Sequence, residues 1–182
     1  ADLFGRLTQK LLTLTMLDSC GEEEREILDA APVVRKVVRM LLPLARLRGI
    51  GIDTTFEPDC SVMTVEDDLY QIVFNLTENA IKYNRQDGWG GVSVRRAGDQ
   101  VELRVEDNGA GIPPESMEHI FERFYRVDKA RSRAAGGAGL GLSIAHDMVE
   151  RSYGTIAVQA RPGGGTIFTV RFPHLDLEED ET

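Results

Sequence analysis

The stretch VELRVEDNGAGIPP, residues 101–114, runs from a strand pattern through a carboxylate to two glycines and a pair of prolines. Apolar and charged residues alternate over its first six positions, so Asp107, the seventh, falls on the apolar side of the predicted strand. A carboxylate buried there needs a partner, and a ligand donor such as an adenine amino group would supply one. A hairpin turn at Asp107 is the alternative. Pro113-Pro114 favours a following helix instead, and Gly109 and Gly111 would let the backbone approach a flat ligand closely.

Periodicity on both sides of this stretch alternates between helix and strand spacing. The predicted helices cover residues 4–17, 34–44, 66–83, 113–124 and 140–151, and the predicted strands cover residues 49–56, 61–65, 92–96, 101–107, 155–160 and 166–172. Gly98-Asp99 marks a hairpin turn between two of these strands. Residues 18–31 are rich in Gly and Glu and indicate a linker before Pro32, whereas residues 127–137 lack periodicity and indicate a mobile loop.

The first predicted helix carries an apolar stripe. Phe4, Leu7, Leu11, Leu14 and Leu17 recur at spacings of three and four residues, which places them on one face of an amphipathic helix. Such a face must be buried, and a partner helix is the natural candidate. The segment is therefore expected to belong to a helical bundle.

Composition limits the classes of protein that fit this chain. It has 182 residues, 42% of them hydrophobic, and a formal net charge of −9, which suits one substantial core and argues against non-specific binding to nucleic acid. One basic stretch reverses the sign locally and is either a solvated face or an anion site. Its members are Arg123, Arg126, Lys129, Arg131 and Arg133. Cys20 and Cys60 support neither a disulfide framework nor a zinc site, and no apolar run reaches the ~20 residues that span a bilayer.

The long predicted helix over residues 66–83 carries a polar group beside its apolar stripe. Asn75, Asn79 and Lys82 are spaced by four and three residues, so they share one face. Asparagine is a weak helix former, and two of them one turn apart fit the oxygen ligation of a hard cation. A solvated polar face is an equally good interpretation of this helix taken alone.

Glycines gather at residues 136–141, directly before the last predicted helix. Backbone N–H groups at a helix N-terminus can wrap phosphate oxygens, and the helix dipole favours their negative charge. Plain flexibility is the common alternative for a Gly-rich loop. The spacing matches neither a Walker loop, since no Lys-Ser or Lys-Thr follows, nor a dinucleotide-binding fingerprint.

Taken together, these motifs resemble those of sensor histidine kinases. The stretches NLTENAIKY (residues 75–83), DNGAGI (residues 107–112) and GAGLGL (residues 137–142) are similar to the N, G1 and G2 boxes of that family. IFERFYRVD (residues 120–128) looks like its F box, and GTIF (residues 165–168) looks like its final Gly-Thr element. The five elements occur in the family's order and cover about residues 33–173.

The resemblance implies a fold and a division of the chain. The fold is an α/β sandwich of the Bergerat ATP-binding type, with a mixed, mostly antiparallel sheet covered on one face by three helices and preceded by an N-terminal helix. Residues 1–31 correspond to the end of a helical dimerisation region and a linker. Residues 32–175 correspond to the ATP-binding catalytic domain, and residues 176–182 form an acidic tail.

The resemblance also implies the site, with ATP and Mg²⁺ as its ligands. Asn79 would ligate Mg²⁺ with Asn75 nearby, Asp107 would bind the adenine amino group, and the lid arginines would approach the phosphates. The implied catalytic residues are Asn75, Asn79, Lys82, Arg126 and Arg131. The implied nucleotide-binding residues are Asn79, Lys82, Tyr83, Asp107, Gly109, Gly111, Ile112, Gly137, Gly139, Leu140, Gly141, Leu142 and Thr166.

Related ATPases with this pocket, such as gyrase, mismatch-repair ATPases and the heat-shock chaperone, place a glutamate four residues before the metal-binding asparagine. Asn75 occupies that position here. The resemblance therefore implies slow hydrolysis, with the γ-phosphate kept for another nucleophile and Glu78 directed away from the reaction line.

A kinase of this class needs a histidine nucleophile on an upstream helix, and His119, His146 and His174 all lie in a different context. The resemblance thus implies transfer to a histidine on a dimerisation helix absent from this chain, with relay to a response regulator aspartate. It implies a cytoplasmic domain of a membrane-associated homodimer with no nucleic-acid partner. A non-catalytic nucleotide-binding scaffold of the same fold and an anti-sigma-type protein-serine kinase are the alternatives.

Overall fold

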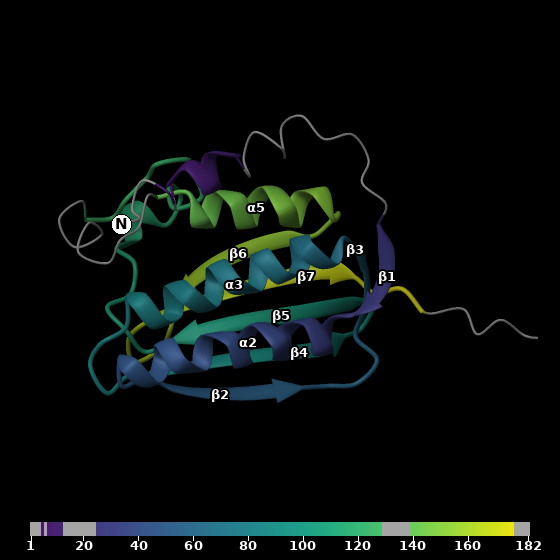
Figure 1. Cartoon of the computed structure of the whole chain (residues 1–182), viewed down its shortest axis with the longest axis horizontal. Coiled ribbons are helices and arrows are strands. Elements are labelled where there is room, and N and C mark those ends of the chain that lie inside the picture. Colours follow the sequence, from purple (N-terminus) through teal and green to yellow (C-terminus); the bar gives the residue numbers. More distant parts are fainter. Residues whose placement is uncertain (1–4, 6, 13–24, 129–138, 177–182) are drawn as a thin grey trace, which may run out of the picture.

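The computed structural model describes residues 5, 7–12, 25–128 and 139–176. Residues 5 and 7–12 are helical. The elements that follow are β1 (Glu26–Asp29), α2 (Ala30–Leu47), β2 (Gly51–Phe56), β3 (Ser61–Thr64), α3 (Glu66–Lys82), β4 (Trp89–Ala97), β5 (Gln100–Asp107), the short 3₁₀ helix η1 (Pro114–Ser116), α5 (Gly141–Arg151), β6 (Thr155–Ala160) and β7 (Thr166–Pro173) (Figure 1).

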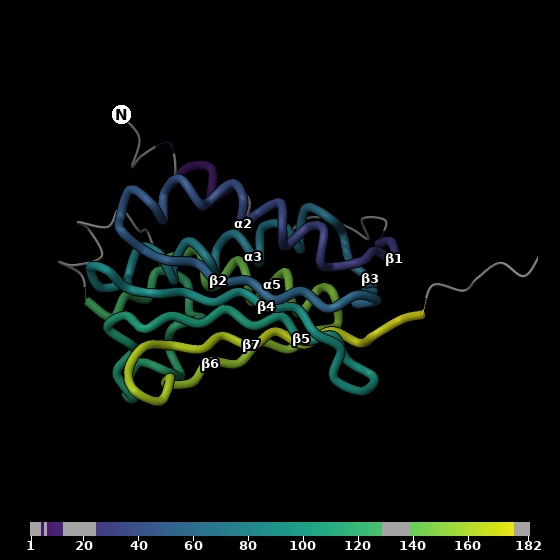
Figure 2. Tube along the Cα trace, turned by 90° about the horizontal axis from the view of Figure 1, so that it is seen from below, coloured from purple at the N-terminus to yellow at the C-terminus, as the bar shows by residue number. Residues whose placement is uncertain are grey.

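Five strands form the main sheet in the order β2-β4-β5-β7-β6. The β2–β4 pair is parallel and the other neighbours are antiparallel, while β1 and β3 form a separate antiparallel pair. Helices α2, α3 and α5 lie together on one face of the main sheet (Figure 2). The predicted α/β sandwich, with a mixed and mostly antiparallel sheet under three helices, is confirmed.

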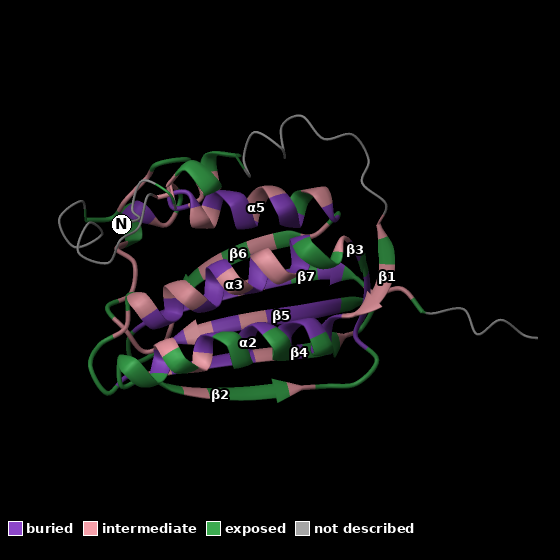
Figure 3. Cartoon of the chain, viewed as in Figure 1, coloured by how far each residue is buried: buried purple, intermediate pink, exposed green. Residues whose placement is uncertain are grey.

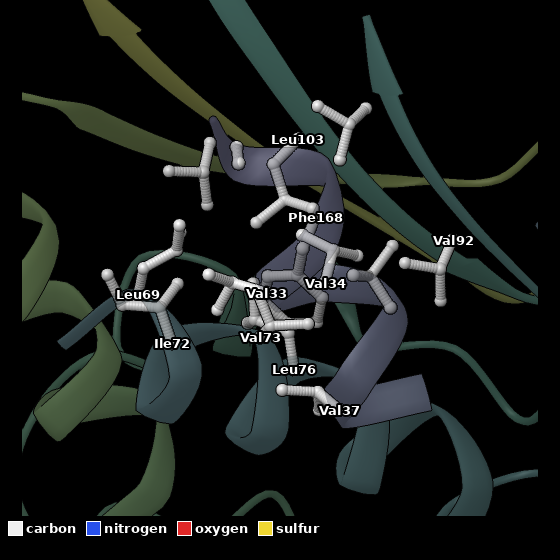
Figure 4. Packing of buried hydrophobic residues seen from close by; sticks show 14 of the residues in the cluster. Val33, Val34, Val37, Leu69, Ile72, Val73, Leu76, Val92, Leu103 and Phe168 are labelled. Carbon is white, nitrogen blue, oxygen red and sulfur yellow. The ribbon is translucent and has the colours of Figure 1, made fainter. Parts of the chain in front are cut away.

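The core lies between the helices and the sheet. On α2, Val34 and Val37 recur at helical spacing, and Figure 4 shows them in one apolar cluster with Leu69, Ile72 and Val73 of α3. All five side chains are fully buried, and the buried sides of the helices face the strands (Figure 3). Burying one aliphatic side chain of this size stabilises the fold by about 1.5–3 kcal/mol. The apolar periodicity of each helix therefore fixes which of its sides faces the sheet.

Polar contacts fix α5 against its neighbours. Arg151, in the last turn of α5, donates from Nε and Nη2 to the Asp68 carboxylate at 2.9 and 2.7 Å. Asp68 lies in the first turn of α3 and is buried, so this pair joins the two helices at one end. The Thr64 and Ser152 hydroxyls form a buried hydrogen bond of 2.7 Å beside it. Because both contacts hold the C-terminal end of α5, they also set where its N-terminus lies.

Two segments differ from the sequence-based expectation. Residues 26–29 of the predicted linker form β1, and α2 begins at Ala30, capped by the Asp29 side chain through the Ala31 N–H at 3.3 Å. A strand of four residues is too short to show a periodic pattern in the sequence. Its partner strand, β3, also lies far away along the chain.

The helix predicted over residues 113–124 was wrong beyond its first turn, η1. Separate turns follow, with the N–H groups of His119 and Glu122 bonded three residues back. Phe124, at a φ of +64°, donates its N–H to the Gly139 carbonyl at 2.9 Å. A tertiary contact thus replaces helix propagation in this segment.

Part of the N-terminal stripe can be placed. Leu7 packs against the core, whereas Leu11 is 41% exposed. Phe4, Leu14 and Leu17 lie outside the described residues, as does most of the loop predicted at residues 127–137. Among the residues that the structure describes, no helix combines the length and apolar composition needed to cross a bilayer.

Candidate functional site

A cleft of about 930 Å³ opens between the C-terminal half of α3, the start of α5, the loop after β5 and the β6–β7 turn. It brings together most residues that the sequence selected. The predicted residues on its walls are Asn75, Asn79, Lys82, Tyr83, Asp107, Gly111, Ile112, Arg126, Gly139, Gly141, Leu142 and Thr166. Their convergence from five separate parts of the chain identifies the cleft as the candidate site.

Asp107 ends β5 at one side of the cleft and is 8% exposed. Its Oδ1 accepts a hydrogen bond from the Gly109 N–H at 2.9 Å. Burial raises the pKa of this carboxyl above its ordinary value, while backbone hydrogen bonds from Gly109 and Thr166 and the charge of Arg161 oppose the shift. The carboxylate thus retains acceptor capacity toward the cleft. The alternative hairpin at Asp107 does not form, because β5 pairs with β4 and β7 and the chain continues into η1.

Glycines let two loops touch behind this carboxylate. Gly165 has a φ of +108°, and a Cβ on it would lie only 1.9 Å from the Asp107 carbonyl oxygen. Gly111 has a φ of +73°, and its Cβ position is 3.4 Å from the Gly165 carbonyl oxygen. The loop after β5 and the β6–β7 turn therefore meet backbone to backbone. Gly109 is not on the cleft wall, since a Cβ there would lie 2.6 Å from the Tyr83 carbonyl oxygen at the end of α3.

The other side of the cleft is formed by α3. Gln71 donates to Asn75 Oδ1 at 3.1 Å, and the buried Asn75 Nδ2 has no partner in the described part of the chain. Asn79 lies one turn further along and lines the cleft. Its side-chain amide has no hydrogen-bond partner among the described residues. Lys82 is ion-paired with Glu78, and both line the cleft. This side therefore offers amide oxygens, which suit a hard cation, next to one paired ammonium group.

The N-terminus of α5 closes the same side. No described side chain caps its first turn, which also lacks acidic residues. Gly139 precedes it at a φ of +75°, and a Cβ there would lie 2.9 Å from the Phe124 carbonyl carbon. Gly141 and Leu142 face the cleft, so unpaired N–H groups and the helix dipole point toward it. Leu140 does not line the cleft, because its side chain is 0% exposed and belongs to the core.

The basic stretch divides between two roles. Arg126 lines the cleft, whereas Arg123 is paired with Asp147 of α5 at 3.4 Å. Lys129, Arg131 and Arg133 lie outside the described residues, and so does Gly137 of the glycine loop.

Arg161 was not predicted, although it lines the cleft beside Asp107 and Thr166. Its guanidinium carbon lies 5.1 Å from the centroid of the Trp89 ring, and its Nε lies 3.8 Å from Glu106 Oε2. The only sequence signal was the glycine run at residues 163–165, which indicated a turn but not which side chains flank the cleft. Lys10 was missed as well, and it reaches the cleft from the N-terminal helix.

The fold and the cleft together define an ATP-binding α/β sandwich, with a buried acid suited to a base at one end and a glycine-flanked helix N-terminus suited to phosphates at the other. The family model for the histidine kinase-, DNA gyrase B- and HSP90-like ATPases matches residues 64–176, more than half of the chain. The chain belongs to this family, and within it to the ATP-binding catalytic domains of sensor histidine kinases of two-component systems.

Individual relatives agree with this assignment. The sensor-like histidine kinase SenX3 of Mycobacterium tuberculosis is 35% identical over 176 residues, which are 96% of this chain but 43% of SenX3. The mycobacterial sensor histidine kinase MprB has a TM-score of 0.70 at 28% identity, with 82% of this chain and 97% of that chain covered. Full-length ShkA in complex with AMPPNP has a TM-score of 0.80 at 27% identity, covering 92% of this chain and 35% of ShkA. The chain thus spans less than half of SenX3.

Proposed function

We propose that this domain binds ATP with Mg²⁺ and transfers the γ-phosphoryl group to a histidine on a dimerisation helix outside this chain. One observation carries the proposal: a single cleft holds a buried carboxylate at one end and, at the other, Asn79 and Lys82 beside the uncapped start of α5. These ends match the two chemically different parts of a nucleoside triphosphate.

The adenine end is the side of Asp107. Its Oδ1 is held by the Gly109 N–H, so the carboxylate is oriented before any ligand arrives. An ionised carboxylate accepts the hydrogen bonds of an exocyclic amino group and repels a keto oxygen, which would select adenine over guanine or hypoxanthine. Gly111, Ile112 and Thr166 complete this end, and the lack of a side chain at Gly111 leaves room for a flat ring.

The phosphate end is the side of α5. Its free N–H groups bind phosphate oxygens, and Arg126 adds positive charge to the same cleft. Lys82 exchanges its contact with Glu78 for a phosphate oxygen when the nucleotide binds. The amide oxygen of Asn79, with Asn75 one turn away, would hold Mg²⁺, and the ion would supply positive charge that neutralises the phosphates. Arg131 and Gly137 are further phosphate-binding residues by resemblance.

Hydrolysis by this chain is slow in our account because the position one turn before Asn79 carries an amide and not a carboxylate. Asn75 is buried and accepts from Gln71, so it cannot take a proton from an attacking water. Glu78 is the nearest carboxylate on α3, but as the direct neighbour of Asn79 it leaves the helix in a different direction from Asn75 and Asn79. The γ-phosphoryl group is thereby kept for a nucleophile supplied from outside the cleft.

Nucleotide affinity is expected to fall on acidification. The hydrogen bond to the amino group needs an ionised Asp107, and burial raises the pKa of this carboxyl above its ordinary 3.8. Protonation therefore begins at a higher pH than for an exposed aspartate, and affinity falls by up to about ten-fold per pH unit below that pKa. Titrating a non-hydrolysable ATP analogue at a series of pH values from 7.5 down to the ordinary aspartate pKa of 3.8 checks this. Asp107→Asn should lose far less affinity over the same range, because only ionisations of the ligand remain; equal losses would contradict the assignment.

Transfer itself is tested by adding a purified dimerisation bundle from a sensor histidine kinase such as SenX3 to this chain with Mg²⁺ and γ-labelled ATP. Acid-labile label on the bundle histidine, with little free phosphate, is the expected result. Alkali-labile, acid-stable label on a serine would favour the anti-sigma-type kinase. Nucleotide binding without any transfer would favour the non-catalytic scaffold.

The wider arrangement follows from the same proposal. The full-length protein would be a membrane-associated homodimer with this domain in the cytoplasm, relaying the phosphoryl group to a response regulator aspartate. The relatives' description as sensor kinases and the apolar stripe of the N-terminal helix support this arrangement.

A further inference from the structure

The helix of residues 5 and 7–12 places one side chain on the wall of the cleft, although neither the motifs nor the proposed chemistry assigns this helix a role there. Leu7 packs against the core, and Lys10, three residues later on the same side of the helix, lines the cleft. The first side chain therefore anchors the helix to the domain, and the second reaches the site.

Lys10 arrives at the end of the cleft that suits phosphates. Its Nζ lies 3.7 Å from the point where a Cβ on Gly141 would stand, and that point is 3.6 Å from Asn75 Oδ1. Gly141 is the first residue of α5, whose free N–H groups face the cleft. Figure 1 shows the helix, in purple, beside the start of α5. The ammonium group thus adds a full positive charge where the helix dipole contributes a partial one.

The charged side chains on the cleft walls bear on the role of Lys10. The cations on its described walls are Lys10, Lys82, Arg126 and Arg161, and the carboxylates are Glu78, Asp107 and Asp128. Without Lys10, the formal charges of the other lining residues sum to zero, although the proposed ligand is a polyanion. Lys82 is matched by Glu78, and Arg161 by Glu106 on β5. Lys10 is therefore one of four cations that the described walls offer to a polyanion.

We propose that Lys10 is a phosphate-binding residue supplied by the N-terminal helix, so that ATP in the cleft and the docking of this helix stabilise each other. The inference rests on the proposed function and adds a coupling to it. If docking strengthens ATP binding, ATP must strengthen docking by the same factor. Because the helix leads toward the proposed dimerisation region, its movement changes the affinity of the site for ATP.

The test compares Lys10→Ala with wild type in titrations of a non-hydrolysable ATP analogue and of adenosine. The expected result is an about five-fold loss of affinity for the analogue, the size of one partly exposed ion pair, and none for adenosine. Leu12→Ala is the matched control, since Leu12 lies on the same helix with an exposed side chain, and it should behave as wild type. Equal affinities of Lys10→Ala and Leu12→Ala for the analogue would overturn the inference, as would an equal loss for adenosine.

A double-mutant cycle separates the charge from the docking. Leu7→Ala should release the helix, so Lys10→Ala in that background should cost much less than in wild type. Full additivity of the two substitutions would contradict the coupling. If wild type bound neither ligand, the proposed function itself would fail. That result differs from ATP binding that Lys10→Ala leaves unchanged, which would contradict only the role of Lys10.

Discussion

Asp107→Asn is expected to weaken the binding of ATP by about a hundred-fold while leaving the domain folded. The substitution keeps the shape of the side chain and the hydrogen bond from the Gly109 N–H. It replaces an ionised acceptor with an amide, which can turn a donor toward the amino group of adenine. Losing a charged hydrogen bond and leaving a donor unpaired gives a loss of this size. Isothermal titration with a non-hydrolysable ATP analogue measures it.

Two controls make this prediction specific. The melting temperature should not fall, because the substitution removes a buried charge whose raised pKa shows that ionisation is disfavoured there. The inosine analogue should bind the variant better than it binds wild type, since an amide N–H can donate to the keto oxygen. A variant that lost affinity for both nucleotides equally would show that Asp107 supports the fold of the cleft and does not distinguish adenine from hypoxanthine.

Gly165→Ala is expected to destabilise the domain by about 3–5 kcal/mol. The added Cβ would stand 1.9 Å from the Asp107 carbonyl oxygen and 2.7 Å from Asn108 Cα, both backbone atoms that cannot rotate away. The φ of +108° adds the strain of any side chain in that region. Overpacking and backbone strain each cost about 1–3 kcal/mol. Urea denaturation followed by circular dichroism gives the difference in free energy of unfolding.

Gly163→Ala provides the matched control. Gly163 lies two residues earlier in the same turn at a φ of +86°, and a Cβ on it would meet nothing within 4 Å. It should therefore lose only the roughly 1 kcal/mol that positive φ costs. Equal losses from the two substitutions would mean that the contact between the β6–β7 turn and β5 does not hold the site together.

Local patterns predicted one wall of the cleft well. Alternation along β5 correctly placed Asp107 inward, because the two-residue period of a strand fixes the facing of every side chain. Helical spacing correctly put Asn79 and Lys82 on one face of α3. The roles of these residues still depend on the ligand and stay predictions.

Contacts between distant segments could not be predicted in this way. Arg161 reaches the cleft because β6 pairs with β7 at the edge of the sheet, a register that no local pattern specifies. Lys10 reaches it because Leu7 docks the N-terminal helix, whereas the stripe indicated only that some partner was needed. The residues at 117–124 leave the helical path because the Phe124 N–H bonds to Gly139, which lies 15 positions later. Leu140 belongs to a matching motif but faces the core, which depends on how α5 is oriented.

The central claim is that one nucleotide lies across this cleft with its base at Asp107 and its phosphates at α5. Amide chemical shifts of the isotope-labelled domain, recorded as a non-hydrolysable ATP analogue and Mg²⁺ are added, test it most directly. Concentrated shifts are expected at residues 75–83, 107–112, 139–142 and 164–166, and adenosine should reproduce only those at 107–112 and 164–166. Saturable shifts confined to another face, such as the exposed side of α2, or no shifts at any nucleotide concentration, would contradict it.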